Sequence, residues 1–428
     1  MRRIAALALC LLLLCGCAAR SGEASAPPEE PSAPETGQPA PAGMLPANGG
    51  AVAQSVGAVY TLRYTAAGFE PSGLWGSYAP RPGADNQLVR YESGEETVLA
   101  SGPWFSPLWV LGDRLVVRQV TEEGSGLACL SRTGEVLWTC GGGDLSVKAA
   151  DPARNLLICG DGWTVFSLDE EGKRADLCQW VRYLAYVDGV LYLRDYARHE
   201  EAVLLRLTLD GQPTELARVT VESGGFSGPV ITQVEVSGDT ANFLYGSYDG
   251  TANVFQGGWL AAAKLDGSEC RILTEVYSDE FFLREKDNGV TLLYPFADQL
   301  LWDGETVLEL DPETGEVTEI DCPVWFQPVG VPFADGNTIR VIKDRSGETI
   351  TLAENIQFPA TEYDEEEPGP WREIRDIAMA DGWLWYTLEV GRYAREYSIG
   401  WRDGYERVVT QVCRMPLSGG EAEVLYEY

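Results

Sequence analysis

The sequence predicts an all-β protein assembled from repeated hairpins, and three observations support this prediction. The chain has 428 residues, 45% of them hydrophobic, which is enough apolar material for a large core and excludes disorder of the whole chain. Beyond residue 56, no stretch shows sustained helical periodicity, whereas short segments alternate apolar and polar residues. Residues 205–209 alternate strictly, the turn Asp210-Gly211 follows, and a second alternating segment runs over residues 214–219.

The same hairpin recurs along the chain at intervals of 32 to 72 residues, each time around a glycine. These glycines are Gly94, Gly134, Gly172, Gly211, Gly267, Gly315, Gly347 and Gly419. A second hairpin precedes most of them, with turns at Gly112-Asp113, Asp188-Gly189, Gly238-Asp239, Asn288-Gly289, Asp335-Gly336 and Asp381-Gly382. Two hairpins in roughly 40–45 residues are typical of one blade of a β-propeller.

Eight such units begin near residues 57, 106, 145, 181, 229, 279, 325 and 372. The seventh unit is short, so we expect a β-propeller of seven or eight four-stranded blades. A pair of β-sandwiches is the alternative architecture, but it does not explain why one type of hairpin repeats.

Three local resemblances agree with this fold. Residues 131–138 (SRTGEVLW) are similar to the outer hairpin of quinoprotein-like propellers, and residues 311–317 (DPETGEV) match it without the tryptophan. This resemblance implies that Trp138 locks neighbouring blades together. Residues 186–192 (YVDGVLY), followed by residues 205–211, resemble the low-density-lipoprotein-receptor (YWTD-like) propeller repeat, which also occurs in bacterial surface lipoproteins. The resemblances specify a blade, and they carry over no quinone-binding or catalytic residue.

The N-terminus combines a basic start with an apolar run from Ile4 to Leu14, which is too short to span a bilayer. The run ends in Leu14-Cys15-Gly16-Cys17, which resembles the bacterial lipoprotein signal. The resemblance implies cleavage before Cys17 and acyl chains such as palmitate on that cysteine, and therefore anchorage to a bacterial cell membrane, facing outward. An ordinary secretory signal is the alternative. We expect a signal peptide over residues 1–16, a lipidated cysteine and a disordered Pro/Ala/Glu-rich tether over 17–56, and the propeller over 57–428.

Composition excludes several classes of function. The chain has 32 basic and 65 acidic residues, a net charge of −33, and such an acidic surface repels the phosphates of nucleic acids. The only histidine, His199, occurs in a polar connection, so a site with several histidine ligands is impossible. No CxxC pair is present, although Cys129 and Cys140 flank one hairpin and a disulfide between them is conceivable. We expect no cofactor and no metal ion.

The last unit is the predicted ligand-contact region, because an acidic loop and several tryptophans gather there in the sequence beside an irregular insertion over residues 391–407. Its candidate residues are Glu362, Asp364, Glu365, Glu366, Glu367, Trp371, Trp383, Trp385 and Trp401. Two alternatives stay open: the acidic run is a solvated loop, and the tryptophans pack between blades.

The sequence therefore favours a membrane-anchored extracytoplasmic lipoprotein whose propeller is a non-catalytic binding or scaffold module for a protein, a peptide or a glycan. One alternative is an extracytoplasmic hydrolase that acts on a polysaccharide through a carboxylate pair. Another is a subunit of an envelope assembly complex.

Overall fold

The computed structural model describes residues 48–428 except 56, 72–77, 142–144, 197–200, 221–229, 250–253, 279, 287–288, 296–305, 322–329, 344–347, 366–368 and 400–401. The predicted signal peptide, Cys17, His199, Glu366, Glu367 and Trp401 lie outside the described residues. No helix within the described ranges has the length and apolar character needed to cross a membrane.

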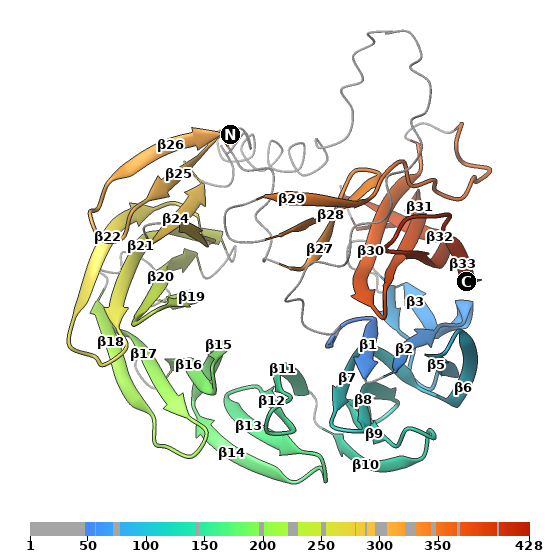
Figure 1. The fold of residues 1–428 in the computed structure, drawn as a ribbon, viewed down its shortest axis with the longest axis horizontal. Coiled ribbons are helices and arrows are strands. Elements are labelled where there is room, and N and C mark those ends of the chain that lie inside the picture. Colours follow the sequence, from blue (N-terminus) through green and yellow to red (C-terminus); the bar gives the residue numbers. More distant parts are fainter. Residues whose placement is uncertain are drawn as a thin grey trace, which may run out of the picture. The chain divides into compact units, whose positions relative to one another are not determined.

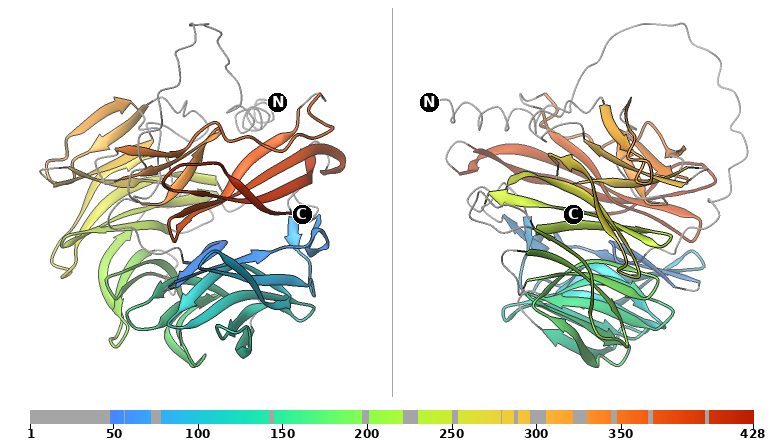
Figure 2. Two further views of the ribbon diagram at one scale, coloured as in Figure 1. Left: turned by 45° about the vertical axis from the view of Figure 1, so that its right-hand side comes forward. Right: turned by 90° about the vertical axis from the view of Figure 1, so that its left-hand side faces the viewer.

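The fold is an all-β propeller, as predicted, and its blades follow one another along the chain (Figure 1). Each blade is a twisted antiparallel sheet, which the further views in Figure 2 show from the side. Among the described residues there are eight such sheets, seven with four strands and one with three.

The strand bounds of the first four blades are as follows. Blade 1 contains β1 (Val52–Ser55), β2 (Ala58–Arg63), β5 (Asn86–Glu92) and β6 (Glu95–Gly102), with the 3₁₀ turn η1 (Ala66–Gly68) and the ribbon β3 (Phe69–Pro71) and β4 (Tyr78–Pro80) between β2 and β5. Blade 2 contains β7 (Trp104–Leu111), β8 (Arg114–Thr121), β9 (Gly124–Leu130) and β10 (Val136–Gly141). Blade 3 contains β11 (Leu145–Asp151), β12 (Leu156–Asp161), β13 (Thr164–Asp169) and β14 (Arg174–Gln179). Blade 4 contains β15 (Val181–Val187), β16 (Val190–Asp195), β17 (Glu201–Thr208) and β18 (Thr214–Thr220).

The remaining four blades have these bounds. Blade 5 contains β19 (Val230–Ser237), β20 (Thr240–Asp249), β21 (Val254–Lys264) and β22 (Cys270–Val276). Blade 6 contains β23 (Phe282–Lys286), β24 (Gly289–Pro295), β25 (Thr306–Leu310) and β26 (Val317–Asp321). Blade 7 contains β27 (Pro332–Asp335), β28 (Thr338–Ile342) and β29 (Thr349–Ala353). Blade 8 contains β30 (Trp371–Ala380), β31 (Trp383–Ile399), β32 (Arg402–Pro416) and β33 (Glu423–Glu427).

The chain divides into two compact units. One contains blades 5 and 6, within Leu216–Val324, and the other contains blades 1 to 3, blades 7 and 8 and most of blade 4.

Two boundaries differ from the sequence expectation. The first blade includes β1 (Val52–Ser55), which pairs with β2, so the tether boundary expected at residue 57 moves toward the N-terminus. In blade 7, Gly347 falls between β28 and β29, whereas the repeating glycine of the other blades lies between the third and fourth strands. After β29, Asn355 has a positive φ of 54°, and blade 7 has no fourth strand among the described residues.

Apolar layers between neighbouring blades form the core. Blades 2 and 3 share one such layer, made of Val116 and Cys129 from one blade and Leu157 and Phe166 from the other, all fully buried. Blades 5 and 6 share another, which includes Leu244, Leu260, Phe281 and Leu292.

Trp138 on β10 locks blade 2 onto blade 3, as its resemblance implies. Its indole Nε1 donates a hydrogen bond to the carbonyl of Glu170 at 3.0 Å. Its ring covers Gly172, where a Cβ would lie only 2.7 Å from the ring and where φ is +77°. Only glycine satisfies both conditions at this turn.

The first and last blades pack together within their unit. Val52 and Val59 of blade 1 share a cluster with Ala380 and Trp385 of blade 8. The backbone N–H of Asp381 also donates to the side-chain oxygen of Gln54 at 3.2 Å. This contact joins the ends of the described chain without a shared sheet.

Candidate functional site

The acidic loop predicted as a ligand contact lies against β30. Glu362, Asp364 and Glu365 are exposed, and Asp364 forms an ion pair with Arg372. Asp364 also accepts a hydrogen bond from the backbone N–H of Thr361 at 3.1 Å. The described part of the run therefore contacts its own chain, and one of its charges is already compensated.

The structure separates Trp371 from Trp383 and Trp385. Trp371 lies opposite Gly391 at one end of the β30–β31 pair, and Trp383 lies opposite Ala380 at the other end. Nine residue steps separate the two ends, which is about 30 Å at roughly 3.3 Å per residue.

Trp383 and Trp385 serve the packing of blade 8 against blade 1. Trp385 is 1% exposed, and its ring meets that of Tyr91 edge-to-face with the centroids 5.2 Å apart. The Arg414 guanidinium lies 4.4 Å from the centroid of the Trp383 ring. Inter-blade packing, the alternative left open above, describes this pair of side chains.

Cys129 and Cys140 are free thiols and do not face each other. Cys129 pairs with Trp138 and Cys140 pairs with Leu127 across the β9–β10 hairpin, so the two side chains are out of register for a disulfide. Burial raises the pKa of the Cys129 thiol to about 12, so it stays protonated and unreactive at neutral pH.

A different site is found when the blades are aligned on their turns and residues at equivalent positions are compared. In blade 2, one row of side chains crosses the sheet and faces blade 3. Its members are Trp109, Val116, Cys129 and Trp138. In blade 5, the row at the same positions consists of Glu235, Asn242, Ala262 and Arg271. The row that is apolar in blade 2 is thus polar in blade 5, where both tryptophans are replaced by smaller, charged side chains.

Arg271 contacts the next blade as Trp138 does. Both residues come four positions after the turn glycine of their own blade. Arg271 donates hydrogen bonds to the backbone carbonyls of Pro312 and Glu313 in blade 6, and Glu313 is the counterpart of the Glu170 that Trp138 contacts. The locking contact is therefore kept, although the space that an indole would fill stays open.

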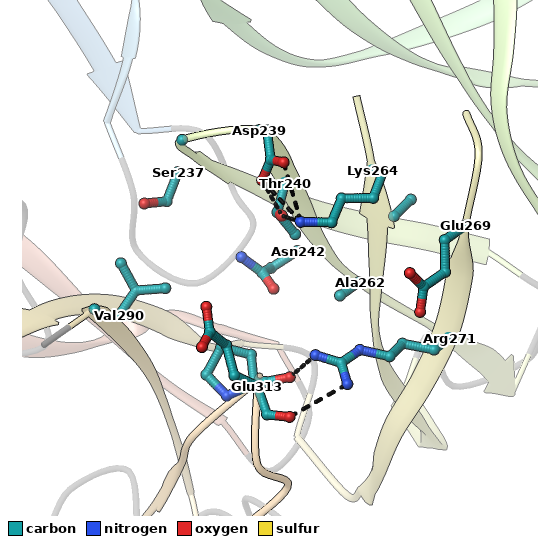
Figure 3. A pocket seen from close by; sticks show the side chains of 14 residues that line it. Ser237, Asp239, Thr240, Asn242, Ala262, Lys264, Glu269, Arg271, Val290 and Glu313 are labelled. Atoms are coloured by element: carbon teal, nitrogen blue, oxygen red, sulfur yellow. Dashed lines mark hydrogen bonds and ion pairs between the residues drawn. The ribbon is translucent and has the colours of Figure 1, made fainter. Parts of the chain in front are cut away.

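The result is a cavity of about 440 Å³ between blades 5 and 6, which we call the blade 5–6 groove. Ser237, Gly238, Asp239, Thr240, Asn242, Ala262, Ala263, Lys264, Glu269, Arg271, Gly289, Val290, Pro312 and Glu313 line it. Its volume falls within the range of ~300–1,000 Å³ found for small-ligand sites. Figure 3 shows Asn242 in the middle, with Asp239 and Lys264 on one side and Arg271 and Glu313 on the other.

Asn242 is the unusual residue of this groove. Its side chain is 0% exposed, and neither the amide nitrogen nor the amide oxygen has a hydrogen-bond partner. The polar residue at the same position of blade 6 does have a partner: the Thr291 hydroxyl donates a hydrogen bond to Glu309 at 3.0 Å. Each buried polar group without a partner costs about 1–3 kcal/mol.

Charged side chains surround the amide. The Lys264 ammonium lies 2.9 and 3.1 Å from the two carboxylate oxygens of Asp239. Hydrogen bonding within this pair lowers the pKa of Asp239 and raises that of Lys264, so both are charged at neutral pH. Within the described part of the chain, no basic side chain forms an ion pair with Glu269 or Glu313, and with three acidic and two basic lining residues the groove has a net charge of −1.

No protein-family model and no curated protein matches the sequence. Among solved structures, a prolyl endopeptidase is similar with 11% identity and a TM-score of 0.38, over 88% of this chain and 49% of the endopeptidase. The tricorn protease is similar with 14% identity and a TM-score of 0.28, over 85% and 35%. TolB from Acinetobacter baumannii is similar with 13% identity and a TM-score of 0.30, over 62% and 63%. This chain thus spans about half or less of the two proteases, and the likenesses concern the fold alone.

Proposed function

We propose that this protein is a membrane-anchored extracytoplasmic lipoprotein whose propeller is a non-catalytic binding module, with the blade 5–6 groove as its ligand site. The observation that carries the proposal is the Asn242 amide, which is fully buried, lacks any partner and lines a polar cavity. Buried polar groups in proteins are almost always hydrogen-bonded, so an orphaned amide beside a cavity indicates a missing partner.

Energetics favour a ligand at this position. The row of blade 2 shows that the repeat accommodates valine where blade 5 has asparagine, so the fold itself does not require the amide. An unpaired donor and an unpaired acceptor together destabilise the ligand-free protein by about 2–6 kcal/mol, and a ligand that bonds both recovers part of that free energy on binding.

The proposed anchor rests on the sequence. Acylation of Cys17 would hold the protein at a membrane firmly, since several acyl chains on one cysteine bind far more strongly than the marginal attachment of a single chain. The following Pro/Ala/Glu-rich segment would then hold the propeller away from the bilayer. A firm anchor and a ligand groove would together suit a role in capture or scaffolding.

The test is a comparison of the full-length protein with Asn242→Leu on a peptide array and a glycan array. We expect the wild-type protein to bind members of one array and the variant to bind them at least tenfold more weakly, because leucine offers neither donor nor acceptor. Equal binding by the two proteins would contradict the assignment of the groove.

A further inference from the structure

We propose that the blade 5–6 groove binds an extended peptide segment that carries a basic side chain. In this proposal the Asn242 amide forms hydrogen bonds with the peptide backbone, and Glu269 and Glu313 form ion pairs with the basic side chain. This inference rests on the proposed function and names its ligand class.

The hydrogen-bonding pattern of Asn242 selects the backbone. A primary amide presents a donor and an acceptor side by side. In an extended strand, the N–H and C=O of one residue point to the same side, which is how paired residues of antiparallel strands exchange two hydrogen bonds. One asparagine side chain can therefore satisfy both groups of one peptide residue, and that residue satisfies both orphaned atoms of Asn242.

The shape of the groove allows an elongated ligand. Asn242 pairs with Ala262 across the sheet, so the position beside the amide has only a methyl group. Gly238 and Gly289 lie at the turns of blades 5 and 6, and a Cβ at either one would have nothing within 4 Å. Both glycine positions are therefore unobstructed, which leaves room beside the turns for part of an elongated ligand.

The charges select a basic side chain. Lys264 is already paired with Asp239, and Arg271 donates to backbone carbonyls and not to carboxylates. Glu269 and Glu313 are exposed, and among the described residues neither has an ion-pair partner, although both help to raise the pKa of Lys264. The net charge of −33 on the whole chain also attracts cationic ligands over a distance. A neutral sugar can donate hydroxyl hydrogen bonds to these carboxylates but does not balance their charge, and none of the described lining residues is an aromatic on which a sugar face packs.

Access to Asn242 requires one side chain to move. Lys264 is the neighbour on the same face of β21, because it pairs with Thr240 two positions before Asn242. Its side chain is 42% exposed and its partner Asp239 is 77% exposed. Exposed ion pairs contribute only about 0–1 kcal/mol, so displacing this lysine costs little.

The experiment measures binding of three capped peptides to the full-length protein in detergent by calorimetry. Their sequences are acetyl-Ala-Ala-Lys-Ala-Ala-amide and its counterparts with central Glu and central Ala, and N,N′-diacetylchitobiose serves as the glycan probe. We expect the Lys peptide to bind at least tenfold more tightly than the Glu peptide, and its affinity to fall as salt rises.

Variants locate the binding. Asn242→Leu should weaken the Lys peptide at least tenfold, and Glu269→Gln and Glu313→Gln should each weaken it by about three- to tenfold. Glu319→Gln is the matched control, because Glu319 is an exposed glutamate on β26 outside the groove. This variant should bind the Lys peptide as tightly as the wild type does. The two glutamate variants keep the test valid if Asn242→Leu does not fold.

The outcomes separate the two proposals. Binding of diacetylchitobiose that depends on Asn242, without peptide binding, would overturn the peptide assignment and leave the ligand site in place. Peptide binding that Asn242→Leu does not change would also overturn it. No binding of any probe, together with no hit on either array, would overturn the proposed function as well, and Asn242 would then hold only an internal water.

Discussion

Replacing Asn242 with leucine should stabilise the ligand-free protein, which is an unusual expectation for a fully buried residue. The substitution removes two buried polar atoms that lack partners, each of which costs about 1–3 kcal/mol. Fitting the branched leucine beside Ala262 offsets part of this gain, since overpacking costs about 1–3 kcal/mol in a tight core and less beside a cavity. We expect a net stabilisation of about 2 kcal/mol.

A second asparagine in the same chain provides the control. Asn86 is also 0% exposed, but its oxygen accepts from the backbone N–H of Thr65 at 3.1 Å and its nitrogen donates to the carbonyl of Trp104 at 3.0 Å. Asn86→Leu removes two formed hydrogen bonds and leaves a buried carbonyl unpaired, so it should destabilise the protein by about 2 kcal/mol or more.

Scanning calorimetry of wild type and both variants measures the difference, with far-UV circular dichroism to confirm that each is folded. For a protein of this size, about 2 kcal/mol corresponds to a shift in Tm of about 2–3 °C. The prediction is a higher Tm for Asn242→Leu and a lower Tm for Asn86→Leu. A lower Tm for both would refute the reasoning, because it would mean that the Asn242 amide has a partner such as a bound water.

Three further predictions concern the anchor, the blade contacts and the acid side of the stability curve. Mass spectrometry of the native N-terminus should find acyl chains on Cys17, and an unmodified cysteine there would contradict the proposed anchor. Trp138→Ala should destabilise the fold by about 2–3 kcal/mol in denaturant titrations, because it loses the hydrogen bond to Glu170 and the ring contact with Gly172. Trp180→Ala is the control: Trp180 is 62% exposed, and its replacement should change stability by less than about 0.5 kcal/mol. Burial raises the pKa of Asp151, but hydrogen bonds from Tyr186 and Arg154 outweigh this effect and hold the pKa below its ordinary value. This carboxylate therefore stabilises the fold above about pH 4, and its contribution disappears as the pH falls further. The difference in stability between wild type and Asp151→Asn should shrink over the same range, and a difference independent of pH would refute this assignment.

The blades could be predicted from sequence because their signals are local. Turn glycines and alternating strands lie within a few residues of one another, so the unit starts expected near residues 145, 181 and 229 agree with β11, β15 and β19. The prediction misplaced Gly347 because a glycine in any turn of a blade has the same local appearance. Blade 7 has no fourth strand among the described residues, so its sequence contains no glycine turn of the kind that marks the other blades.

The candidate site could not be found by reading along the chain. Trp371 and Trp383 are twelve residues apart in sequence, yet a long antiparallel strand places them at opposite ends of a blade. Asn242, Ala262 and Arg271 are far apart in sequence, yet the strand register aligns them in one row. A signal was available, since aligning the units on both of their turns shows Asn242 three positions after the first turn of blade 5. Its lack of a partner depends on side-chain geometry and is visible only in the structure.

The central claim is that the Asn242 amide is the contact point of a ligand site, and its own NMR signal tests this most directly. The side-chain NH₂ resonances of Asn242 and Asn86 can be assigned in the ¹⁵N-labelled protein from the spectra of the two leucine variants. On titration with acetyl-Ala-Ala-Lys-Ala-Ala-amide, the Asn242 signal should shift and saturate, while the Asn86 signal, whose amide is already bonded to Trp104, should stay in place. The account would be contradicted if the peptide bound without shifting the Asn242 signal, or if the peptide did not bind at all.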